Sequence, residues 1–429
     1  MIVRIDTQQL KIGMYVCELD RPWRETPFLF QGFEIRTEEE LAKLRQYCRT
    51  VFVIATDADM LALPAHASVH PDLFKAMAVT APGKTPVVSI EQEILKLNNH
   101  PGARSVYADQ TTLEEEIQNV KDIYAGACGL MQELMWEAKF GRSLDVPGAR
   151  QIVSRMVESA LRNPDALICF AQLKKKDEYS AMHGLRVSIL SLVFGRQLGL
   201  EPADLEMLGL GALLLDIGKM KIPSDILNKP TSLTGDELAL VRQHVPWGVE
   251  ILEKTNQVPA MALEVARRHH ERYDGSGYGE RLKGDAIGTF GMIAGILDYY
   301  DAVTSDRAYR DGISAHVALK KMYEGRGTLF HSELTEKFIQ CLGIYPIGSV
   351  VELNTGEIGV VAAHNRAHRL KPRVVLVQRP DKTPYPEMPA VSLVNRKNPD
   401  GRACEIERVL EPADCGIDPA RYLPLPKSV

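Results

Sequence analysis

The chain has 429 residues and a formal net charge of -5. Apolar residues make up 45% and charged residues 25%, which is typical of a soluble globular protein of about two or three domains. This charge balance excludes a general basic field for a nucleic acid polymer or an anionic membrane, although a local cluster of Lys and Arg could hold a small anion.

The sequence predicts neither a leader peptide nor a membrane span. Its N-terminus lacks a basic start followed by an apolar run. The longest apolar stretches, such as 208–215, are far shorter than the roughly 18 residues that a membrane span needs. The seven cysteines are scattered and form no CxxC pair, which indicates reduced thiols rather than disulfides. We therefore expect a cytoplasmic protein.

The first 57 residues predict a small α+β module. Short apolar stretches at 14–20, 28–35 and 51–55 accompany a helical piece at 38–47. Residues 58–111 are rich in Pro, Ala, His and Gly and keep no period, so we interpret them as a linker.

A helical domain is predicted over 112–344. Its first helix starts at Thr112, where glutamates in the first turn suit the helix dipole. Apolar residues then recur at helical spacing between Ile152 and Leu161, and Asn163-Pro164 ends that helix.

The pattern changes again over 345–429. Short apolar strands separated by turns occur at 350–353, 359–361, 374–377 and 404–407, which predicts a small β-rich module. The expected fold class is therefore mainly α, with one all-helical domain flanked by two small modules.

Several histidines of the helical domain lie near carboxylates, and the group comprises His183, Asp216, His244, His269, His270 and Asp298. Imidazole and carboxylate together suit Fe, Mn, Zn or Ni, and such ligands can converge from different helices of a bundle. Adjacent helical residues point about 100° apart, so the His269-His270 pair can reach one site only near a helix end. We expect Gly275 and Gly277 to supply that end. The histidines outside this pattern are expected on the surface: His316, His331, His364 and His368.

These residues resemble the HD-GYP family, whose members hydrolyse cyclic di-GMP in bacteria. The order and spacing of the family's motifs are kept from residue 183 to residue 310. The matching segments are His183-Gly-Leu-Arg-Val, Asp216-Ile-Gly-Lys219, His244, His269-His270-Glu271-Arg-Tyr-Asp-Gly-Ser-Gly-Tyr278 and Asp298-Tyr-Tyr-Asp301 through Arg307 to Arg310. The resemblance implies an all-helical HD-GYP domain between the two small modules.

The resemblance also implies a metal centre that cleaves a phosphodiester. One or two divalent ions, with Fe or Mn favoured, would be held by His183, Asp216, His244, His269, His270 and Asp298 and would activate water for attack on phosphorus. Asp216 and Lys219 are the expected catalytic residues. Lys219, Arg307 and Arg310 would face the phosphates of the substrate. Cyclic di-GMP is the implied ligand, and diguanylate cyclases, other signalling proteins and a second copy of the chain are the implied partners.

One metal ligand of the family's pattern is missing. Leu215 stands where the family has the histidine of its His-Asp pair, and leucine cannot ligate a metal. The half-site formed by Asp216, His244, His269 and His270 keeps its residues. The second ion should be weakened by at least the 10–100-fold that the loss of a supporting group around a metal causes.

The loop after the His-His pair also departs from the pattern. The motif usually continues Gly-Tyr-Pro, whereas this chain has Gly277-Tyr278-Gly279. Glycine leaves φ free where proline would fix it.

Two functions stay open on the sequence alone. The chain is either a metal-dependent phosphodiesterase of cyclic di-GMP with reduced activity, or a catalytically inactive domain that acts as a cyclic di-GMP receptor or a protein-interaction scaffold. Leu215 is the feature that separates them, because an enzyme needs the metal that this position no longer helps to hold.

Overall fold

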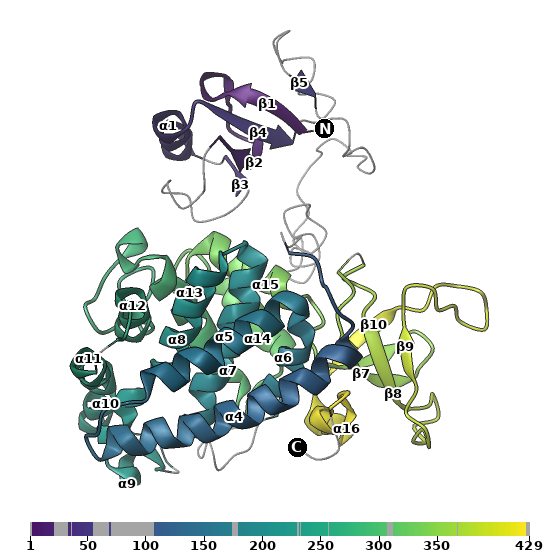
Figure 1. The fold of residues 1–429 in the computed structure, drawn as a ribbon. Coiled ribbons are helices and arrows are strands. Elements are labelled where there is room, and N and C mark those ends of the chain that lie inside the picture. Colours follow the sequence, from purple (N-terminus) through teal and green to yellow (C-terminus); the bar gives the residue numbers. More distant parts are fainter. Residues whose placement is uncertain are drawn as a thin grey trace. The chain divides into compact units, whose positions relative to one another are not determined.

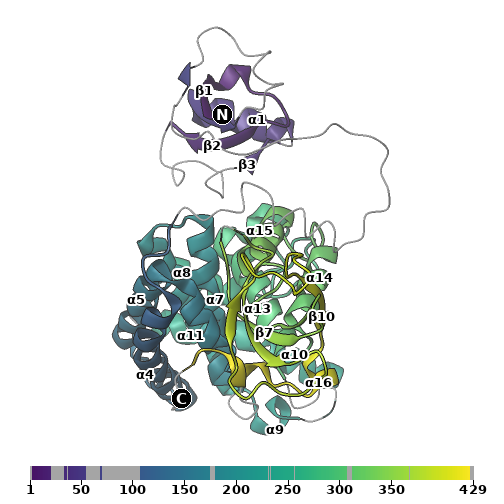
Figure 2. The ribbon, with the colours of Figure 1, turned by 90° about the vertical axis from the view of Figure 1, so that its right-hand side faces the viewer.

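The computed structural model describes residues 2–20, 33–35, 37–54, 68–69, 107–173, 179–229, 231, 233–255, 257–306, 312–366 and 368–425. The chain divides into two compact units, residues 1–88 and 89–429. Figures 1 and 2 show the elements of each unit from two directions.

The described residues of the first unit form a five-stranded antiparallel sheet, with strand order β3-β2-β4-β1-β5, together with one α-helix and one short 3-10 helix. Its elements are β1 (Ile2–Asp6), η1 (Thr7–Gln9), β2 (Tyr15–Leu19), β3 (Phe33–Glu34), α1 (Glu38–Tyr47), β4 (Thr50–Ile54) and β5 (Ser68–Val69). Helix α1 begins after Thr37, which forms a capping box with Glu40. Leu41 and Leu44 of α1 are buried together with apolar residues of the strands. The α+β prediction and the helix at 38–47 are confirmed.

The second unit begins with a helical body. Its elements are α4 (Leu113–Lys139), α5 (Val146–Arg162), α6 (Pro164–Ala171), α7 (Tyr179–Leu198), α8 (Pro202–Leu214), η5 (Ile217–Lys221), α9 (Ser224–Leu227), α10 (Gly235–Arg242), α11 (His244–Lys254), α12 (Ala260–Arg268), η6 (Gly284–Ile287), α13 (Thr289–Thr304), α14 (Ala315–Glu324) and α15 (Ser332–Leu342). Helix α7 runs through the middle and contacts α4, α5, α6, α8, α13 and α15. Residues 182–195 of α7 are buried on every side, and polar side chains among them have partners, such as Arg186 on Asp301 and Ser188 on the carbonyl of Gly209.

The ends of the first helices follow the local sequence. Helix α4 begins after Thr112, whose side chain accepts from the backbone N–H of Glu115 in a capping box. Asn163 ends α5, and its side chain caps α6 by accepting from the backbone N–H of Asp165 at 3.1 Å. Both predicted helix boundaries are confirmed.

Two glycines allow close contact between the segments that carry the candidate metal ligands. A Cβ at Gly184 of α7 would lie 2.6 Å from the carbonyl oxygen of Leu213 in α8. A Cβ at Gly218 of η5 would lie 2.0 Å from the carbonyl oxygen of His244, the first residue of α11. Only glycine permits these approaches, so α8 and η5 lie against α7 and α11 at backbone distance.

A second five-stranded antiparallel sheet follows the helices, with strand order β10-β6-β7-β8-β9. Its elements are β6 (Val350–Leu353), β7 (Ile358–Ala363), β8 (Arg373–Gln378), β9 (Ala390–Ser392) and β10 (Ile406–Leu410), followed by α16 (Pro412–Cys415) and η7 (Pro419–Tyr422). The β-rich prediction is confirmed, but the last strand begins at Ile406 rather than at residue 404. Cys404 instead closes a turn, because its backbone N–H donates to the carbonyl of Arg396 at 2.9 Å.

An ionic network around the buried Asp165 ties this sheet to the helical body. Asp165 of α6 accepts from the backbone N–H of His364 at 2.9 Å and from Arg366 at 2.8 Å. Arg366 also donates to Asp109 at 2.8 Å. Burial raises the pKa of the Asp165 carboxyl, but Arg366 and His364 outweigh burial and hold this pKa well below its usual range. The expectation that His364 lies on the surface is wrong, because its partner comes from a helix far away in the sequence.

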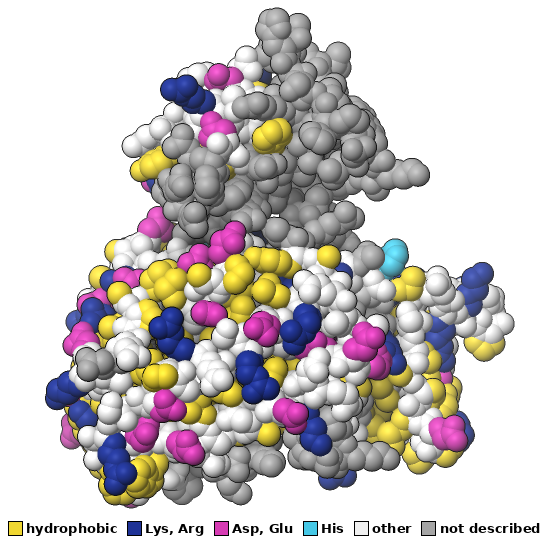
Figure 3. Space-filling view, in the orientation of Figure 1, with side chains coloured by type: hydrophobic (Ala, Val, Ile, Leu, Met, Phe, Trp, Pro, Cys, Tyr) yellow, Lys and Arg dark blue, Asp and Glu magenta, His cyan; other side chains and the backbone are white. Residues whose placement is uncertain are grey.

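The described surface carries charges of both signs. On the face drawn in Figure 3, Lys and Arg side chains lie interspersed with Asp and Glu on the described residues. None of the described helices combines the length and the apolar character that crossing a membrane requires.

Replacing Asp165 by Asn should destabilise the second unit by about 1–3 kcal/mol, because Arg366 would keep only its partly exposed partner Asp109 and the N–H of His364 would lose a charged acceptor. Denaturant unfolding at pH 7 measures this loss. The control is Asp400→Asn, which removes an exposed pair with Arg402 and should leave the free energy of unfolding almost unchanged.

The Asp165 effect should also depend on pH. The pKa of Asp165 is depressed in the folded state, so its contribution is complete above the unfolded pKa of about 3.9 and is lost as the pH falls through more acidic values. The difference between wild type and Asp165→Asn should therefore narrow in acid. Equal effects of the two substitutions at pH 7 would contradict this account of the network.

Candidate metal centre

The structure gathers the candidate ligands from five segments of the helical body. His183 lies on α7, Asp216 between α8 and η5, His244 at the start of α11, His269 and His270 directly after α12, and Asp298 on α13. All except His270 are at least nine-tenths buried, and His270 is partly buried. The centre therefore lies inside the bundle rather than on its surface.

The end of α12 allows adjacent histidines to reach one site. The helix ends at Arg268, and His269 is its C-cap residue. Arg272 donates to the backbone carbonyls of His269 at 3.3 Å and of Glu271 at 2.9 Å, which satisfies acceptors that the helix leaves open. The predicted helix end is present, but Gly275 and Gly277 do not form it, because the chain has left the helix before it reaches them.

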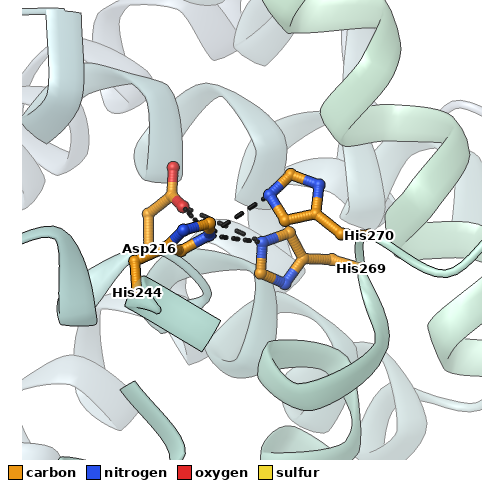
Figure 4. A group of neighbouring side chains, drawn as sticks. All are labelled: Asp216, His244, His269 and His270. Atoms are coloured by element: carbon orange, nitrogen blue, oxygen red, sulfur yellow. Dashed lines mark hydrogen bonds and ion pairs between the residues drawn. The ribbon is translucent and has the colours of Figure 1, made fainter. Parts of the chain in front are cut away.

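Four of the candidate ligands form one compact group. The ligand atoms of Asp216, His244, His269 and His270 all lie within 4.8 Å of one another. Oδ1 of Asp216 is 3.3 Å from Nε2 of His244 and 3.8 Å from Nε2 of His269. Nε2 of His244 is in turn 3.4 Å from Nε2 of His269 and 3.2 Å from Nε2 of His270. Figure 4 shows the side chains pointing toward one another.

The other ring nitrogens fix how these imidazoles are protonated. Nδ1 of His244 is 2.7 Å from the carbonyl oxygen of Val241, and Nδ1 of His269 is 2.8 Å from that of Ala266. A carbonyl only accepts, so Nδ1 carries the proton and Nε2 presents a lone pair to the site. Nδ1 of His270 lies 3.4 Å from Oδ2 of Asp298, which favours the same arrangement.

This donor set fits a divalent cation. Three lone pairs face one another, and the buried Oδ1 of Asp216 has no hydrogen-bond partner among the described residues. These four electron-rich atoms repel one another when nothing lies between them, and a positive ion among them would accept all four lone pairs. Burial is the main cause that lowers the pKa of His244 to about 4 and the pKa of His269 and His270 below their ordinary value. The imidazoles are therefore neutral at pH 7, as ligation requires.

His183 sits in a different environment. Its Nδ1 is 2.7 Å from Asp301, and its Nε2 is 3.0 Å from Asp298 and 3.5 Å from Oδ2 of Asp216. Burial lowers the pKa of His183, but the hydrogen bonds with Asp298 and Asp301 outweigh burial and raise this pKa overall. Leu215, which directly precedes Asp216, is completely buried, and its side chain has no atom that could bind a metal. His183 and Asp298 thus adjoin the four-residue group without being part of it.

Sequence reasoning assigned no role to Asp301 and Arg186. Arg186 donates to both carboxylate oxygens of Asp301, at 2.8 and 3.0 Å, while Asp301 contacts His183. Helical spacing carried a signal for both residues. Each lies three positions after a candidate ligand, Arg186 after His183 and Asp301 after Asp298, and such pairs share a helix face.

The remaining predicted site residues lie around the group. Nζ of Lys219 is 2.5 Å from Oδ2 of Asp216, and its side chain is 13% exposed. The Tyr278 ring stacks on His270 with centroids 4.5 Å apart. Gly279 has a φ of +121°, which proline cannot adopt because its ring fixes φ near −65°. The loop therefore has a backbone conformation that the Gly-Tyr-Pro sequence of the usual motif could not form. Arg307 and Arg310 lie outside the described residues.

Comparison with known proteins agrees with the motifs. The HD domain family matches residues 168–334, and a domain of unknown function, DUF3391, matches residues 2–149. A cyclic di-GMP phosphodiesterase of Pseudomonas aeruginosa is 34% identical over 96% of this chain and 93% of its own length. A cyclic di-GMP phosphodiesterase of Thermotoga maritima is 34% identical over 38% of this chain and 45% of its own. A 3'3'-cGAMP-specific phosphodiesterase of Vibrio cholerae is 32% identical over 39% of this chain and 32% of its own.

Removing one of the three histidines should empty the four-residue group. His269→Ala leaves three donors and takes away a ligand that its own helix orients, so metal content after anaerobic loading with Fe or Mn should fall to a small fraction of the wild-type value. Elemental analysis of the purified protein measures it. His368→Ala is the control, because His368 is exposed. Equal metal content in the two variants would exclude His269 as a ligand.

Proposed function

The chain belongs to the HD-GYP family, and we propose that it hydrolyses cyclic di-GMP at a centre that holds one divalent ion, Fe or Mn, with lower activity than a complete pair of ions would give. One observation carries the proposal. Asp216, His244, His269 and His270 supply four convergent donors, whereas the adjoining side has His183 held by two carboxylates and a buried Leu215.

The residues of the centre suit phosphodiester cleavage. A divalent ion bound by the four donors would lower the pKa of a water molecule and polarise a phosphate oxygen. Burial raises the pKa of Asp216, but Lys219 and the neighbouring histidines lower it further, so Asp216 is an anion at pH 7. Lys219 stands beside Asp216 and is partly exposed, so it can reach a phosphate from the edge of the centre.

The substrate assignment rests on the relatives and on charge. A relative that matches 96% of this chain is named for cyclic di-GMP, whereas a relative named for 3'3'-cGAMP matches 39% of this chain. Both ligands carry two phosphodiesters. We infer that Arg307 and Arg310 join Lys219 in contacting the phosphates, since guanidinium groups bind phosphate oxygens in pairs.

A catalytically inactive receptor or scaffold is the second candidate. It is favoured by His183, whose two nitrogens are both engaged by carboxylates, because a site with few ions can bind a nucleotide without cleaving it. In this candidate the small modules pass the signal to a partner, such as a diguanylate cyclase or a second copy of the chain. The altered conformation at Gly279 gives such a partner a different loop to contact.

Turnover and metal content together test the enzyme. The protein is purified and loaded anaerobically with Fe or Mn, and the hydrolysis products of cyclic di-GMP are separated by chromatography. We expect about one ion per chain and slow linearisation. Less than one ion together with no product would overturn the enzyme proposal. Calorimetric titration with cyclic di-GMP then separates a receptor, which releases or absorbs heat, from a scaffold, which does not.

Restoring the missing ligand should raise metal content. In Leu215→His the new imidazole extends the adjoining half-site, so the content should rise toward two ions per chain and the rate of hydrolysis should increase. Leu214→His is a matched control, because Leu214 is equally buried but points about 100° away around the helix. If the metal content of Leu215→His does not exceed that of the wild type, the missing ligand does not explain a single-ion centre.

A further inference from the structure

A buried carboxylate beside the metal centre binds a stretch of backbone. Glu271 directly follows His270 and is 3% exposed. One of its oxygens accepts from the backbone N–H groups of Glu280 at 2.6 Å and of Arg281 at 2.9 Å. The other oxygen accepts from the N–H of Leu282 at 3.1 Å. The buried carboxylate of Glu271 therefore binds the backbone of the loop and is not one of the four candidate metal ligands.

The loop is shaped to meet this carboxylate. Arg281 has a φ of +56°, a left-handed conformation that non-glycine residues rarely adopt. Successive N–H groups around such a residue converge on one point and form a concave site for an anion. Hydrogen bonds to a charged acceptor are about twice as strong as neutral ones, which compensates for the strained residue.

The same loop covers one side of the centre. The backbone N–H of Tyr278 donates to the carbonyl of His270 at 3.2 Å, and the two rings stack at an interplanar angle of 28°. The guanidinium of Arg242 lies 5.0 Å above the Tyr278 ring. A Cβ at Gly277 would lie 2.4 Å from the backbone nitrogen of Arg272, so the loop is seated closely on the end of the ligand-bearing turn.

We propose that Glu271 is a positioning residue that holds the loop 277–282 in place, so that Tyr278 keeps the His270 ring in its ligating orientation and shields the bound ion. Glu271 is neither a ligand nor a catalytic group. It acts through three backbone hydrogen bonds at one end of the loop, and Tyr278 transmits the constraint at the other end. The proposal rests on the proposed function only in assuming that the four-residue group holds an ion.

Amide hydrogen exchange of the metal-free full chain tests the anchor directly. Glu271→Gln replaces one acceptor oxygen by an NH2 group, which cannot accept from a backbone N–H. We expect the amides of residues 280–282 to exchange at least about ten-fold faster than in the wild type. Glu280→Gln is the matched control. It makes the same change in the same loop, but the partner of its side chain among the described residues is Arg268 at the surface, at 3.4 Å.

Release of the ion tests the effect on the centre. Protein loaded with Mn is mixed with a chelator, and we expect Glu271→Gln to release the ion about 10–100-fold faster than the wild type and Glu280→Gln. Tyr278→Ala should also release the ion faster, while it leaves exchange at residues 280–282 close to the wild-type rate. This second variant carries the test if Glu271→Gln does not fold.

The outcomes separate positioning from a purely structural role. If Glu271→Gln only lowers the unfolding temperature and changes neither exchange nor release, the proposal is wrong. If Tyr278→Ala releases the ion at the wild-type rate, the shielding part is wrong. Exchange is measured without metal or substrate, so it decides the anchor even for a protein that neither binds Mn nor cleaves cyclic di-GMP.

Discussion

The metal centre depends on how closely the backbone of α8 approaches that of α7. At Gly184 no side chain separates the helix from the carbonyl of Leu213, so the segment after α8 enters the middle of the bundle. Asp216 can then stand between His183 and the three clustered histidines. The four-residue group, the position of Lys219 and the burial of the centre all follow from this contact, since a methyl group at residue 184 would force the two helices apart.

Asp216 connects two unequal sides through its two oxygens. Oδ1 faces the histidines, whose lone pairs are set by hydrogen bonds to carbonyls of their own helical turns. Oδ2 faces Lys219 and His183. The first side is organised for a cation, while positively charged or hydrogen-bonding side chains already occupy the second. The two sides of Asp216 therefore differ in more than the missing histidine. On the side of His183, the carboxylates of Asp216 and Asp298 already have protein partners.

Much of the architecture could be predicted from the sequence, because local signals determine it. The capping residues at Thr112 and Asn163, the periodic apolar face of α5 and the alternation of strands act over a few positions. Long-range partners carry no such signal. His364 pairs with Asp165 only because the packed fold brings distant segments together. Helical spacing could place Arg186 and Asp301 beside candidate ligands, but it could not pair them with each other. The predicted module boundaries at residues 57, 111 and 344 stay predictions. Most of the predicted linker, residues 58–111, lies outside the described residues.

The two departures from the family's motifs differ in whether the backbone would accept the family's usual residue. Leu215 has ordinary right-handed helical dihedrals, with φ −55° and ψ −34°, so histidine could return there without a change of backbone. Gly279 has a conformation that the ring of proline forbids, and it lies beside the Glu271 anchor. A proline introduced alone at position 279 would be incompatible with the present backbone conformation of the loop. Restoring proline at position 279 therefore requires a new loop conformation, whereas restoring histidine at position 215 requires only a new side chain.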